Sequence, residues 1–99
     1  MTTTEFFKIK TSGRALDFAR QIELQKSDVL PANQFLVDFC KKMHSPKAHV
    51  MVLHSGATVL VYSKTEYRYE LYPKAIVRTQ LGFCKNEVKV YDLPENLQQ

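Results

Sequence analysis

The sequence predicts an α+β fold, a single domain in which two helices pack on one face of a mainly antiparallel sheet. Two patterns carry this prediction. Between about residues 13 and 43 the apolar side chains recur at the spacing of helices, and after residue 48 short apolar or alternating runs are separated by turn residues. The 99 residues have room for one modest core. We therefore expect one compact domain over residues 1–99, with the order β-α-α-β-β-β-β-β and a polar tail at about 94–99.

A strand and a helix are expected in the first 26 residues. Residues 4–11, TEFFKIKT, are rich in the aromatic and β-branched side chains that favour a strand. Ser12 is a suitable N-cap for a helix from Gly13 to about Lys26, because a serine hydroxyl can accept a free backbone N–H of the first turn. The apolar residues of this helix form one stripe, and its charged residues occupy the rest of the circumference.

The second helix has the most regular apolar pattern in the chain. Pro31 suits the first turn of a helix that contains residues 32–43. The helix should end before Pro46, since a residue that precedes proline disfavours the helical conformation. The predicted core-facing stripe consists of Phe35, Leu36, Phe39, Cys40 and Met43.

The second half of the chain is predicted to form five strands. A loop at residues 54–57, with Gly56 available for a positive φ, joins the first two strands as a hairpin. Pro73 ends the third strand, because proline cannot donate to a strand ladder. The expected strands are residues 49–53, 58–62, 67–72, 75–81 and 87–91, and the turn GFCKN joins the last two.

The lengths of the loops decide which side chains share a face of the sheet. The 54–57 loop places Met51 opposite Leu60. If the next loop has four residues, 63–66, Tyr69 also lies opposite Leu60, and the tyrosines join the methionine and leucine face that the helices are expected to cover. The opposite face would then be an outward apolar patch and a predicted protein interface, made of Val50, Val52, Val59 and Val61.

A three-residue turn after Tyr62 would instead move the tyrosines to the valine side. Tyr67, Tyr69 and Leu71 would then form an outer aromatic platform, flanked by Lys64, Lys74 and Arg78. Aromatic rings beside cations are the surface that single-stranded nucleic acid uses, because bases stack on the rings. Core positions are the preferred prediction for Tyr62, Tyr67 and Tyr69, and the surface alternative stays open.

The charge of the chain favours an anionic partner. The formal net charge is +4 and the pI is near 9.1, although the basic residues are spread along the sequence. We expect a small binding or regulatory module with RNA or single-stranded DNA as its partner. The predicted nucleic-acid-binding residues are Lys8, Lys10, Arg14, Lys64, Tyr67, Arg68, Tyr69, Lys74 and Arg78. The alternative is a protein-interaction module, a homodimer or a regulator of a larger protein, that uses an apolar sheet face or an edge strand.

Catalysis and cofactor binding have no motif to support them in this sequence. The ten acidic residues are dispersed, and the three glycines form no phosphate loop. Cys40 and His44 lie four apart on one helical face, as zinc ligands can, but His49 and His54 are an odd number apart and would point to opposite faces of a strand, and no CxxC or HxxxH pair accompanies them. We therefore expect a non-enzymatic protein with no metal and no cofactor.

The two cysteines are expected to be reduced thiols. Cys40 belongs to an apolar helix stripe, where burial raises the pKa of a thiol. Cys84 lies in a turn beside Lys85, and whether it is reactive stays open. The N-terminus, MTTTEFFKIK, has no secretory pattern, and no apolar run approaches the roughly 20 residues of a membrane span. A cytoplasmic location without a membrane partner is expected.

Overall fold

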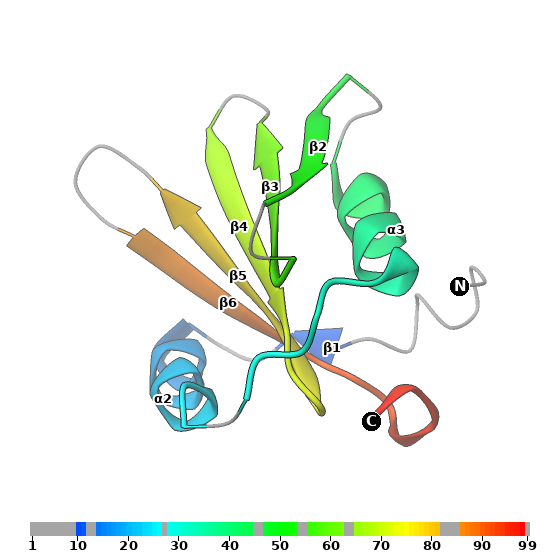
Figure 1. Ribbon diagram of the computed structural model, residues 1–99. Coiled ribbons are helices and arrows are strands. Elements are labelled where there is room, and N and C mark those ends of the chain that lie inside the picture. Colours follow the sequence, from blue (N-terminus) through cyan, green and yellow to red (C-terminus); the bar gives the residue numbers. More distant parts are fainter. Residues whose placement is uncertain are drawn as a thin grey trace.

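The computed structural model describes residues 10–11, 14–26, 28–44, 47–53, 56–62, 65–81 and 86–98 (Figure 1). Its elements are β1 (Lys10–Thr11), α2 (Arg14–Leu24), α3 (Gln34–Met43), β2 (His49–Val52), β3 (Thr58–Tyr62), β4 (Glu66–Leu71), β5 (Ala75–Leu81), β6 (Asn86–Asp92) and the 3-10 turn η1 (Glu95–Leu97). The strands form one sheet in the order β1-β6-β5-β4-β3-β2, and every neighbouring pair is antiparallel. The predicted α+β class, a single compact domain with an antiparallel sheet, is confirmed.

The helices form where the apolar periodicity predicts them, with a different start for α3. Asn33 is its N-cap, and the Asn33 side chain accepts a hydrogen bond of 2.9 Å from the backbone N–H of Leu36. The helix therefore begins after Asn33, and Pro31 lies in the linker instead of the first turn. The linker is fixed to the sheet by Leu30, which bridges to Leu71, and by Ala32, whose N–H donates to the Gly56 carbonyl at 2.7 Å. The predicted N-cap at Ser12 and most of the predicted strand 4–11 lie outside the described residues.

The two helices pack on opposite faces of the sheet, so the prediction that they share one face is wrong. Leu36, Phe39 and Cys40 of α3 are buried against a set of sheet residues that we call the α3 face: Val59, Val61, Tyr69, Leu71, Ile76 and Tyr91. Leu24 of α2 packs against the opposite side, the α2 face, at Tyr72, Ala75, Val77 and Val90. The physical reason lies in β5, where consecutive apolar residues from Ala75 to Val77 give both faces a surface that needs cover.

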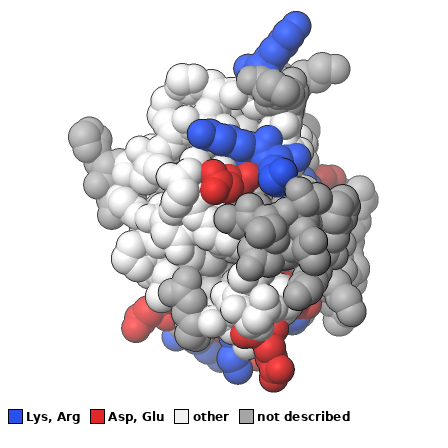
Figure 2. All heavy atoms as spheres, turned by 90° about the vertical axis from the view of Figure 1, so that its right-hand side faces the viewer, with Lys and Arg blue, Asp and Glu red and all other residues white. Residues whose placement is uncertain are grey.

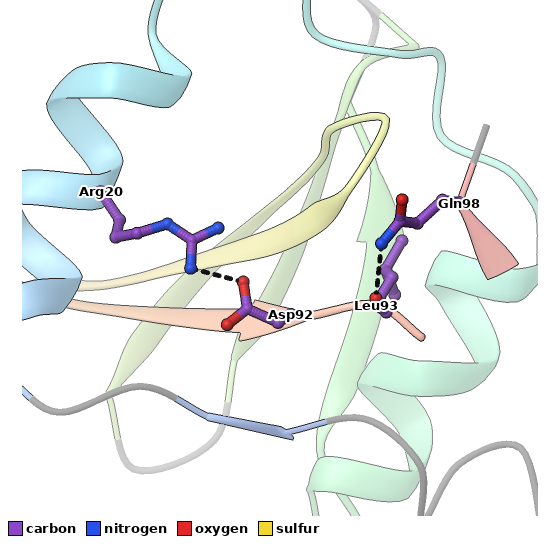
Figure 3. Close-up of polar contacts among 4 residues, drawn as sticks. All are labelled: Arg20, Asp92, Leu93 and Gln98. Atoms are coloured by element: carbon purple, nitrogen blue, oxygen red, sulfur yellow. Dashed lines mark hydrogen bonds and ion pairs between the residues drawn. The ribbon is translucent and has the colours of Figure 1, made fainter. Parts of the chain in front are cut away.

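Polar contacts hold α2 and the C-terminal residues against the sheet (Figure 3). Arg20 of α2 forms an ion pair with Asp92 of β6, with 2.7 Å between Nη1 and Oδ1. The Gln98 side-chain amide donates to the Leu93 carbonyl at 3.0 Å, which folds the end of the chain back after η1. Among the described residues, no helix is long and apolar enough to cross a bilayer.

The first hairpin has the predicted register and the second does not. Met51 lies opposite Leu60, and Gly56 adopts the positive φ of 73° that the loop needs. The loop after Tyr62 has three residues, because Tyr62 lies opposite Glu66. This is the alternative register, in which Tyr69 lies opposite Val59.

This register makes the outward valine face a wrong prediction. Val59 and Val61 are fully buried beneath α3, and Val50 is half-buried beside them. Val52, at the end of the edge strand β2, is exposed. The larger side chains of the methionine and leucine face favour that face for the core in the sequence. In the structure α3, the helix with the most regular apolar stripe, covers the valines instead.

Tyrosines join the valines in this core. Tyr69 is fully buried, which confirms its preferred core position, and Tyr67 is half-buried on the same face. Tyr62 is on the other face and is exposed, so its predicted core position is wrong. No outer platform of tyrosines is therefore formed by the described strands.

Candidate interaction surfaces

The predicted nucleic-acid-binding residues do not come together on one surface. Tyr67, Tyr69 and Arg78 lie on the α3 face, whereas Arg68 is exposed on the α2 face. Lys74 is exposed in the turn between β4 and β5, at the opposite end of β4 from Tyr67. Lys8 and Lys64 lie outside the described residues, and the structure describes only the backbone of Lys10 in β1 and of Arg14 at the start of α2.

The charges also form no continuous basic stripe on the side that Figure 2 shows. The described Lys and Arg side chains appear there as separate groups, with acidic side chains next to some of them and uncharged surface between them. A surface that follows a nucleic-acid backbone needs cations along a path. The described part of this side does not present one.

A polar cluster lies on the α3 face beside the C-terminal end of α3. We call it the Arg78 cluster, and it consists of His44, Tyr67, Tyr69, Arg78 and Tyr91. The Arg78 guanidinium carbon is 5.2 Å from the centre of the Tyr67 ring and 6.0 Å from that of Tyr91. The His44 ring is 4.6 Å from the Tyr67 ring, and its Nε2 is 2.6 Å from the Tyr69 hydroxyl oxygen. Aromatic rings thus contact Arg78 on the face of the sheet that α3 covers, where an arginine is unusual.

Burial sets the protonation of this cluster. Desolvation raises the pKa of Tyr69 far above its ordinary value, so the hydroxyl keeps its proton. Desolvation, and then the positive charge of Arg78, lower the pKa of His44, so its imidazole is neutral at pH 7. The Tyr69 hydroxyl and Nε2 of the neutral His44 ring therefore share one hydrogen bond, in which the tautomer of the ring decides which group donates.

Cys40 has the surroundings of an unreactive thiol. It is fully buried in α3, and desolvation raises its pKa to about 12. A thiolate is the reactive form of cysteine, and this pKa removes it at physiological pH. Cys84 lies outside the described residues, and among those described no group of three His, Cys, Asp or Glu residues could hold a metal ion.

The exposed apolar residues gather at the edge strand β2 and its neighbour β3. In the described part of the chain four large apolar side chains are exposed, and three of them are Met51 at 39%, Val52 at 49% and Tyr62 at 42%. Met51 and Tyr62 lie on the α2 face, at the part of the sheet that α2 leaves uncovered, because α2 contacts β6. The fourth, Ile22, is on α2 and is 49% exposed.

A hollow between α2 and the β4–β5 turn has a mixed lining. Arg20, Glu23, Leu24, Pro73 and Lys74 surround it. Its cations are accompanied by a carboxylate, and Arg20 is already paired with Asp92. This hollow does not favour one class of ligand.

Comparison of the chain with protein-family models, with curated proteins and with solved structures finds no match. The candidate surfaces therefore rest on the geometry alone. Sequence reasoning placed Met51 and Tyr62 in the core, whereas both are exposed, and it considered His44 only as a metal ligand. The length of the loop after Tyr62 was the signal that could have corrected the position of Tyr62.

Proposed function

We propose that this chain is a non-enzymatic protein-interaction module and that its working surface is the edge of β2 with the adjoining side chains of Met51, Val52 and Tyr62. The observation that carries the proposal is the position of three of the four exposed apolar residues at this one edge of the described sheet. Exposed apolar groups that gather at one place are typical of contact surfaces, whereas single ones are ordinary.

The backbone of β2 supports the addition of a further strand. The Leu53 N–H donates to the Thr58 carbonyl at 2.9 Å, so Leu53 faces β3. Residues of an antiparallel strand alternate in direction, and Met51 therefore also faces β3 while Val50 and Val52 direct their N–H and C=O groups outward. Those groups can pair with another extended chain.

The side chains of β2 do not protect this edge. Natural proteins block an edge strand with charged residues, with proline or with a bulge. The four residues of β2, HVMV, include no charged residue and no proline, and they pair with β3 without a bulge. An unprotected edge of this kind is expected to be covered in the working protein.

The occupant we propose is a second copy of this chain. A two-fold axis normal to the sheet places the α3 faces of the two copies on the same side of the joined sheet. Because side chains alternate along a strand, two residues that pair across the axis must both have even or both have odd numbers. With Met51 on the axis, Val50 pairs with the partner's Val52 through their outward backbone groups, and the two Met51 side chains face each other. Two copies of this edge can therefore pair with each other. Their outward backbone groups match, corresponding side chains lie on the same face of the joined sheet, and the side chains that meet are apolar.

The experiment is a comparison of molar mass for three chains. Light scattering coupled to size-exclusion chromatography should give about twice the 11.5 kDa mass of the chain for the wild type. Val52→Lys should give a monomer, because it places charge at the pairing edge. Ile22→Lys is the matched control, since Ile22 has the same 49% exposure on α2, and it should still dimerise. A wild-type chain that is monomeric at all concentrations tested would refute the homodimer.

Binding of RNA or single-stranded DNA is the second candidate, and the net charge of +4 favours it. Nucleic-acid binding ranks lower because Tyr69, which was predicted to stack on bases, is fully buried. We expect any such binding to weaken steeply with salt. Fluorescence anisotropy with a single-stranded oligonucleotide at about 50 mM salt tests it, and no binding there would remove this candidate.

A further inference from the structure

We propose that Arg78 and Lys89 form a binding site for a phosphate group on the α3 face, next to the Arg78 cluster. The two residues lie directly opposite each other on β5 and β6, and both are half-buried. This site is separate from the β2 edge and does not depend on the proposed function.

The first reason is that two like charges lie directly opposite each other, and no ion pair joins either of them to a carboxylate among the described residues. Like charges directly opposite in a sheet are destabilising. In the described part of the chain the ion pairs join Arg20 to Asp92 and Arg68 to Glu66, and neither involves Arg78 or Lys89. A bound dianion would convert this repulsion into two attractive contacts.

The second reason is that one donor of the arginine has no acceptor, although the guanidinium also contacts the hydroxyls of Tyr69 and Tyr91. Its Nε atom is buried and has no hydrogen-bond partner. A buried donor without a partner is unusual for a guanidinium, which carries five N–H groups. The Tyr67 and Tyr91 rings meanwhile fix the guanidinium in place, so it is ordered before a ligand arrives.

The choice of phosphate follows from charge and from the state of the nearby rings. A phosphate monoester carries about −1.5 to −2 charges at pH 7, which matches one Arg and one Lys better than a single carboxylate does. The ring of Tyr67 already contacts His44 and Arg78, so it offers no free stacking platform for a base. The site therefore recognises the phosphate group itself.

Inorganic phosphate is the probe, added to the full chain at constant ionic strength with chloride as the balancing anion. We expect saturable changes in the ¹H–¹⁵N NMR spectrum at β5 and β6. Lys89→Met should weaken the apparent affinity by about tenfold or more, the size expected for one charge-assisted contact. Lys74→Met, at an exposed lysine in the β4–β5 turn, is the matched control and should bind as the wild type does.

Two results would overturn the site. One is a wild-type spectrum that phosphate changes no more than chloride does. The other is equal weakening in Lys89→Met and Lys74→Met, which would indicate a general charge effect. Arg78→Lys provides a further check because it keeps the charge and removes the planar fork, and it should also weaken binding in a variant that circular dichroism shows to be folded.

Discussion

Replacing Tyr69 by phenylalanine should destabilise the fold by a predictable amount. The hydroxyl is buried and lies 2.6 Å from Nε2 of His44, so Tyr69→Phe removes this hydrogen bond and the contact of the hydroxyl with Arg78 but no ring packing. A hydrogen bond contributes about 0.5–1.5 kcal/mol net to the free energy of unfolding. Because His44 is half-buried, water can reach its ring in the variant, and the larger cost of a fully unpaired buried group does not apply. We expect a loss of about 1 kcal/mol.

Equilibrium unfolding in urea measures this loss, and in a domain of this size it corresponds to a fall in melting temperature of about 4–8 °C. The matched control is Tyr62→Phe, which deletes the same hydroxyl from a ring that is 42% exposed. Its effect should lie within about 0.5 kcal/mol of zero. If both variants lose the same stability, or if Tyr69→Phe loses none, the His44 contact does not stabilise the fold and the reasoning fails.

Three further predictions concern the same core. Tyr91→Phe should lower the free energy of unfolding by less than Tyr69→Phe does, because the buried Tyr91 hydroxyl has no hydrogen bond of standard geometry and only a contact with Arg78; a loss as large as that of Tyr69→Phe would contradict this. The pKa of His44 is lower in the folded chain than its ordinary 6.5, so the unfolded chain binds more protons and stability should fall as the pH drops below about 6.5. Urea unfolding at about pH 5.5 and 7.5 should show a smaller difference in His44→Gln than in the wild type, and equal differences would exclude His44 as the cause. In a Cys84→Ser chain, Cys40 should react with a thiol reagent only after unfolding, since its pKa is about 12 and it is fully buried; fast labelling of the native chain would refute this.

Local patterns in the sequence predicted most of the elements and the first hairpin. Apolar periodicity located both helices, and Gly56 marked a turn whose positive φ requires glycine. These features depend on residues close together in the chain. The residues that stabilise each of these features are neighbours in the sequence, and the predictions for them therefore agree with the structure.

Two features depended on information that the local pattern lacks. The loop after Tyr62 has three residues instead of four, and this difference moves Tyr67 and Tyr69 from one face to the other. The positions of the helices on opposite faces depend on tertiary packing, because α2 contacts β6 and α3 contacts β2, β3 and β4. As a result, Val59 and Val61 were expected at an interface and lie in the core. Met51 and Tyr62 were expected in the core and are exposed at the edge of the sheet.

The short pairing of β1 with β6 has a consequence for the order of folding. Strands β2 to β6 form a meander in which each strand pairs with its neighbour in sequence, so their contacts close small loops. By contrast, Lys10 pairs with Asp92, about 80 residues further along the chain, and closing so long a loop has a larger entropic cost. The meander can therefore form first and provide the template on which β1 docks. The same chain would open in the reverse order, with the β1 contact breaking before the central strands separate.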